Sequence, residues 1–235
     1  MDSQTRHALK QDKFVQTTQT GVSWVGEHRS SVIRISIIVV VVLLLIAGGA
    51  VFYTQRSAAA ESALGAALDT YTSQLAQPGA PATKGVYATS ADRAKAANQQ
   101  FSAVASQYGW LSQGGKAHYF AGLTYQELGQ NASAETELKA AADSWNSDLS
   151  SLAKFALAGF YHSTSRDGQA IDLYTALAAK PTNSVPAYTA QLALADLYNS
   201  AGKTDQAKKI WAQIKDADKT GQAGSMAAEK LTAKK

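Results

Sequence analysis

Residues 188–221 read YTAQLALADLYNSAGKTDQAKKIWAQIKDADKTG, and two earlier segments of the chain align with them without gaps. The first segment, GKAHYFAGLTYQELGQNASAETELKAAADSWNSD, starts at Gly115, and the second, SLAKFALAGFYHSTSRDGQAIDLYTALAAKPTNS, starts at Ser151. The three starts are 36 and then 37 residues apart, close to the period of roughly 34 residues that is typical of helix–turn–helix repeats. The alignment therefore predicts three consecutive helical hairpins over residues 115–221.

The positions that agree between the three segments are the ones that the packing of helices requires. Small residues let the two helices of a hairpin approach closely, and large apolar residues fill the space between hairpins. Gly129 and Gly202 stand between the helices, where a left-handed backbone often ends a helix, and Ser165 takes that place in the middle segment. The matched sets are Gly122, Ala158 and Ala195; Tyr125, Tyr161 and Tyr198; Ala134, Ala170 and Ala207; Leu138, Tyr174 and Trp211; and Ala141, Leu177 and Ile214.

The pattern resembles the tetratricopeptide repeat family, in which small–x–x–Tyr is followed by Ala–x–x–x–aromatic–x–x–Ala. It departs from the family at the Trp position of the first helix, which holds His118, Lys154 and Gln191. Residues 57–75 and 91–108 are similar to a fourth, degenerate repeat with an enlarged loop. The resemblance implies an all-α tetratricopeptide-repeat solenoid with three clear repeats plus one degenerate repeat. A generic helical bundle is the alternative.

Residues 35–53 read ISIIVVVVLLLIAGGAVFY and contain no charged residue. The length matches the roughly 20 residues that an α-helix needs to cross a hydrocarbon core. Each of the 12 Val, Ile and Leu residues, and Phe52, favours membrane insertion by about 0.3–0.6 kcal/mol. A buried core helix would normally keep a polar face, and a cleaved signal peptide normally has a shorter segment before its apolar run than the 34 residues found in this chain. The run therefore predicts a single transmembrane helix ahead of the solenoid.

The basic residues around this run predict its orientation. Arg29 and Arg34 directly precede the run and Lys10 and Lys13 lie further back, whereas Arg56 alone follows closely. Lysine and arginine accumulate on the cytoplasmic side of membrane spans. We therefore expect a cytoplasmic N-terminus and a repeat domain on the other side of the membrane.

These features divide the chain into five predicted parts. Within the polar N-terminal tail, the segment from Trp24 to Arg34 is either a helix lying at the membrane surface or part of a disordered tail. A capping helix is expected at the C-terminus, because a terminal repeat otherwise exposes its hydrophobic face. The parts are the cytoplasmic tail (1–34), the transmembrane helix (35–53), a helical linker with the degenerate first repeat (54–114), three repeats (115–221) and the capping helix (222–235).

The composition argues against chemistry carried out by the chain itself. There is no cysteine, which excludes disulfides, thiolate metal sites and cysteine nucleophiles. The four histidines have no metal-ligand spacing, and no Gly-rich phosphate loop or GxSxG sequence is present. The net charge of +4 is concentrated before the repeats, which argues against nucleic-acid binding. We predict no enzyme activity, no cofactor, no metal and no small-molecule substrate.

A repeat array binds partners instead, and the first helices of its hairpins line the concave face. In the resembled family, ligand-facing positions alternate with packing positions on that helix. Carried over, Tyr119, Leu123, Phe155 and Leu192 would form an apolar strip suited to an extended peptide or a partner helix. The alternative is that these residues pack against neighbouring hairpins. The implied partner-binding positions are Lys116, Tyr119, Leu123, Gln126, Leu152, Phe155, His162, Leu192, Asp196 and Asn199.

The whole layout resembles the YfgM-like family, an ancillary subunit of the bacterial Sec translocon. Residues 24–29, WVGEHR, are similar to the family's aromatic–x–x–Glu–Asn–basic sequence before the span, with His28 in place of Asn. The resemblance implies a bacterial inner-membrane protein with a periplasmic domain, and translocon subunits and periplasmic chaperones as partners. The alternatives are a scaffold for a cell-envelope or division complex and a sensor-like regulator that signals through the tail.

Overall fold

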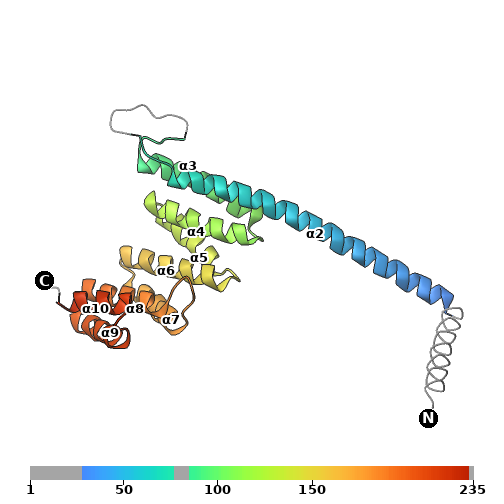
Figure 1. The fold of residues 1–235 in the computed structure, drawn as a ribbon. Helices are drawn as coiled ribbons and strands as arrows, with labels where there is room; N and C mark the ends of the chain where they lie inside the picture. The colour runs from blue at the N-terminus through green and yellow to red at the C-terminus, as the bar shows by residue number, and fades with distance from the viewer. Residues whose placement is uncertain (1–27, 77–84, 233–235) are drawn as a thin grey trace, which may run out of the picture. The chain divides into compact units, whose positions relative to one another are not determined.

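The computed structural model describes residues 28–76 and 85–232, and these residues are almost entirely helical (Figure 1). One isolated bridge pairs Leu75 with Tyr87, between the helix that ends at Thr72 and the helix that begins at Ser90. The all-α fold class is therefore confirmed for the described part of the chain. The predictions for residues 1–27, including the segment that starts at Trp24, lie outside the described residues.

The bounds of the described helices are α2 (Arg29–Thr72), α3 (Ser90–Tyr108), α4 (Ser112–Glu127), α5 (Asn131–Ala142), α6 (Ser147–Ser163), α7 (Asp167–Ala179), α8 (Ala187–Ser200), α9 (Thr204–Ala217) and α10 (Gln222–Thr232). From α3 onward the described helices follow one another with short connections.

The chain divides into two compact units, Met1–Gln55 and Arg56–Lys235. Helix α2, which begins in the first unit, is long and apolar enough to cross a membrane, as the sequence predicted. The large apolar side chains of residues 35–53 are exposed, from 47% at Val42 to 71% at Leu45, and none of the most apolar stretch of α2 is buried. A buried core helix is therefore the wrong interpretation of this run.

Helix α2 also differs from the prediction in its continuity. The sequence suggested a span over residues 35–53 and a separate helix after it, but the structure has one helix of 44 residues from Arg29 to Thr72. Gly48, Gly49 and Gly65 do not break it, because each keeps helical backbone geometry and no residue in the stretch is a proline.

In the second unit, each helix from α3 to α10 packs against the next helix in the sequence (Figure 1). Helix α4 also touches α6, and α8 also touches α10. The first core cluster joins α2, α3 and α4 around Leu64 and Phe101, where Phe101 stacks on Phe120 with ring centroids 5.2 Å apart. The second joins α5 to α8 around Leu138 and Phe160, and the third joins α8 to α10 around Trp211.

The turns inside the three predicted hairpins have the backbone that the sequence indicated. Gly129 and Gly202 have positive φ angles of 70° and 76°. Ser165 has φ 59° in the equivalent turn, a conformation that a side chain makes less favourable. The pairs α4/α5, α6/α7 and α8/α9 thus occupy the predicted hairpins, with α4 beginning at Ser112, three residues before the aligned segment.

Candidate partner-binding face and end groove

The predicted positions on α4 lie along one side of the helix, because their spacing of three and four residues matches its turn. Lys116 is exposed, whereas Tyr119, Leu123 and Gln126 are half-buried. The Tyr119 ring packs against a small cluster of alanines contributed by α5 and α6 and meets the Phe120 ring edge-on at 5.2 Å. Burial raises the pKa of the Tyr119 hydroxyl. This side of α4 is therefore partly covered by the next hairpin.

The predicted positions on α6 divide between packing and polar contacts. Leu152 is half-buried, and Phe155 meets the Tyr174 ring of α7 edge-on with centroids 5.2 Å apart. His162 connects three helices, because its Nδ1 lies 2.7 Å from Asp167 Oδ1 on α7 and its Nε2 lies 3.2 Å from Ser200 Oγ on α8. His162 thus joins two hairpins at the end where α6 turns into α7.

The predicted positions on α8 lie beside the C-terminal helix. Leu192 is half-buried against the core cluster around Trp211. Asp196 is exposed and accepts from Lys230 Nζ of α10 with both carboxylate oxygens at 3.0 Å. Asn199 is half-buried near the end of α8.

The structure therefore brings together three of the four residues of the predicted apolar strip. Tyr119, Leu123 and Phe155 all pack against the core cluster of α5 to α8, whereas Leu192 packs against the next cluster. Each of the four also keeps some exposed surface. Their contacts agree with the packing alternative, and a role of their exposed surface in partner binding stays a prediction.

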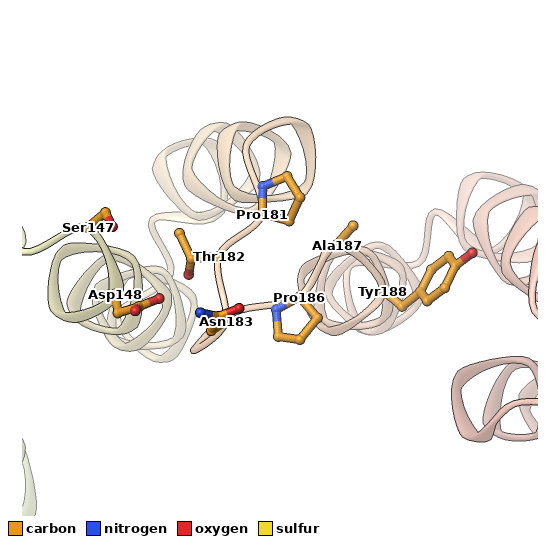
Figure 2. A pocket seen from close by; sticks show the side chains of 8 residues that line it. All are labelled: Ser147, Asp148, Pro181, Thr182, Asn183, Pro186, Ala187 and Tyr188. Atoms are coloured by element: carbon orange, nitrogen blue, oxygen red, sulfur yellow. The ribbon is translucent and has the colours of Figure 1, made fainter.

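A groove of about 860 Å³ opens at the end of the array where α7 connects to α8. Figure 2 shows the loop from Pro181 to Pro186 curving between Asp148 on α6 and Tyr188 on α8. The Ser184 amide donates to Asp148 Oδ1 at 3.3 Å, which holds the loop against α6. None of the ten predicted residues lines this groove, because the repeat pattern covers helices and carries no information about a connecting loop.

A polar cluster that the repeat pattern does not predict joins the α4/α5 hairpin to the α6/α7 hairpin. Glu135 accepts from Lys139 Nζ and Arg166 Nη1, each at 2.7 Å, and from the Tyr161 hydroxyl at 3.2 Å. The Arg166 guanidinium lies over the Tyr161 ring, 4.4 Å from its centroid. Hydrogen bonds from Lys139 and Arg166 lower the pKa of Glu135 to about 2.

Replacing Glu135 with glutamine is expected to lower the free energy of unfolding by about 1–2 kcal/mol at neutral pH. The folded pKa lies below the ordinary value of 4.5, so the carboxylate stabilises the fold above about pH 4.5 and this contribution is lost as the pH falls toward 2. Thermal melts of the full chain in detergent micelles should therefore show a gap between wild type and E135Q that narrows below pH 4.5. Asp216→Asn removes an exposed partner 4.0 Å from Lys215 and should change nothing. A gap that persists unchanged at pH 2.5 would contradict the role given to Glu135.

Within residues 28–76 and 85–232, no group of three or more histidine, cysteine, aspartate or glutamate side chains could hold a metal ion. No protein-family model, curated protein or solved structure matches the chain. The case for a function therefore rests on the exposed apolar helix, the helical array and its surfaces.

Proposed function

We propose that this protein is a membrane-anchored protein–protein interaction module whose hairpins form a tetratricopeptide-repeat solenoid. One observation carries the proposal. Helix α2 has an exposed apolar stretch long enough to span a membrane, and the same helix continues into the core of the second unit at Ala60 and Leu64. An anchor that is continuous with a folded array of hairpins would hold a binding surface close to a membrane.

The consecutive packing of the helices and the accessible surface of the first helices support a binding role. The consecutive packing of α3 to α10 agrees with a solenoid, in which each hairpin contacts mainly its neighbours. Lys116 is exposed and Leu152 and Gln126 are half-buried on the first helices, so part of this face is accessible to a partner. The partners that we propose are subunits of the Sec translocon and periplasmic chaperones, with the array in the periplasm of a bacterial inner-membrane protein. A scaffold for a cell-envelope or division complex is the alternative.

In-cell photo-crosslinking tests this proposal. A photoreactive amino acid at Lys116 or Leu152 is expected to give adducts with translocon subunits or periplasmic chaperones, because both positions lie on the proposed partner-binding face. The matched control is Lys208, which is exposed on α9, the second helix of its hairpin. Adducts to division or wall-synthesis proteins would favour the scaffold instead. Equal labelling from Lys116, Leu152 and Lys208, or none, would contradict a binding face on the first helices.

A further inference from the structure

One end of the second unit lies next to the point where the chain enters it. The Gln113 side-chain amide, in the first turn of α4, donates to Ser57 Oγ at 3.2 Å and to Glu61 Oε2 at 3.0 Å on α2. The turn between α3 and α4 is thereby held beside residues 57–61, which are the first turns of α2 inside this unit.

The turn between α5 and α6 and the loop between α7 and α8 lie at the same end of the array as the turn between α3 and α4. A Cβ atom on Gly115 would stand 3.0 Å from Leu149 Cδ2 and 3.6 Å from Ser144 Oγ, so the turn between α5 and α6 touches the start of α4. The loop between α7 and α8 follows, fastened to α6 through Asp148. We call residues 109–111, 143–146 and 181–186 together the junction edge.

Two exposed tryptophans belong to the junction edge. Trp145 is 82% exposed and Trp110 is 58% exposed. Among the described residues after the apolar run, the other exposed large hydrophobic side chains are Leu75 and Met226, and neither belongs to this edge. The hairpin turns at the opposite end, residues 128–130, 164–166 and 201–203, contain no aromatic residue. The exposed aromatic surface is thus concentrated at one end.

The chain sets a limit on how far this end can be from the proposed span. The apolar run ends at Tyr53, four residues before Ser57. Four residues reach at most about 14 Å even when fully extended. Whatever the conformation of this junction, the Ser57 end of the unit stays within that distance of the end of the span.

We propose that the junction edge lies on the membrane surface, with Trp110 and Trp145 inserted at the boundary between lipid headgroups and acyl chains. Tryptophan suits this boundary, because its ring is apolar and its indole N–H can bond to water or headgroups. The proposal rests on the proposed membrane anchor and adds a second contact with the lipid surface. That contact would fix the direction in which the array and its partner-binding face point.

The charges at the edge indicate how the contact depends on lipid composition. Asp143 lies within the edge, and Asp148 and Lys180 flank its other connections. Arg56 and Lys116 directly adjoin Ser57 and Gly115 at this end. Since acidic and basic residues are mixed at this end, attraction to anionic headgroups contributes little. The contact should therefore form equally on zwitterionic phosphatidylcholine vesicles and on vesicles that contain phosphatidylglycerol.

Tryptophan fluorescence of the full chain in vesicles tests the proposal. The parent protein carries Trp24→Phe, which removes the indole on the other side of the proposed span; Trp211 remains as a constant background because it is 3% exposed. Phosphatidylcholine brominated near the headgroup end of its acyl chains is expected to quench the parent's emission. Trp110→Ser and Trp145→Ser should each remove part of the quenched emission, and the double variant nearly all of it. As a matched control, Gln130→Trp in the double variant places an indole at the opposite end and should not be quenched.

Flotation of the same samples separates this inference from the anchor. In one outcome, the chain floats with the vesicles, but its emission is quenched by aqueous iodide and not by brominated lipid. This result would overturn the membrane contact and leave the anchor standing. It would favour a protein partner at these tryptophans. Quenching only with phosphatidylglycerol would also overturn it, because the contact would then depend on charge. A chain that does not float would overturn the anchor together with the inference that rests on it.

Discussion

Substituting Leu44→Asp and Leu45→Asp together should release the protein from the membrane. The 13 large apolar residues of the run favour insertion by about 4–8 kcal/mol in total. Two aspartates near the centre of the span cost about 5–7 kcal/mol on the same scale, in addition to the lost leucines. The sum cancels most or all of the driving force, so the variant should leave the membrane fraction after carbonate extraction of cells.

The matched control for this prediction is Leu44→Ala with Leu45→Ala, which shortens the same side chains without adding charge and should leave the protein in the membrane fraction. Mass measurement of the retained wild-type protein gives a second check, since a cleaved signal peptide would remove the apolar run and a span would keep it. A double-aspartate variant that still resists carbonate extraction would contradict a membrane anchor built on α2.

The repeat alignment predicted much of the packing inside the hairpins. The shared alanines Ala134, Ala170 and Ala207 are all fully buried, and the bulky residues four positions later, Leu138 and Trp211 among them, are buried as well. These positions could be predicted because the packing inside a hairpin depends only on the sequence of that hairpin. Two helices joined by a short turn must place small residues where they cross. The turn residue at each hairpin was predicted for the same local reason.

The contacts between hairpins could not be predicted from the sequence. Glu135 and Arg166 are 31 positions apart, and His162 and Ser200 are 38 positions apart. Which faces meet depends on the angle between successive hairpins, and a periodic pattern does not contain that angle. The candidate site could be predicted only in part for the same reason. The residue spacing placed Phe155 on the first helix of its hairpin, but it did not show that the Tyr174 ring would pack against the Phe155 ring.

Replacing Leu138 with alanine should strongly destabilise the α4/α5 hairpin and the array that contains it. Leu138 is fully buried in the core cluster of α5 to α8, next to Gly122 of α4. Removing its isobutyl group loses transfer free energy and leaves a cavity, a combination that typically costs about 2–5 kcal/mol. The total stability of a domain is only about 5–15 kcal/mol. Urea melts of the full chain in detergent micelles should therefore show a much lower midpoint for L138A.

The same contact gives a test in which the size of an effect depends on the neighbouring side chain. A Cβ on Gly122 would lie 2.6 Å from Leu138 Cγ and 3.1 Å from its backbone nitrogen, so Gly122→Ala alone should destabilise the array through crowding. In the L138A background the contact with Cγ is gone and only the backbone nitrogen stays close, while alanine favours the helix, so the same substitution should destabilise the array much less. Gly168→Ala, in α7 with no atom within 4 Å of its Cβ position, should stabilise both backgrounds alike, by up to about 1 kcal/mol. Equal effects of Gly122→Ala with and without Leu138 would mean that this contact does not set the spacing of α4 and α5.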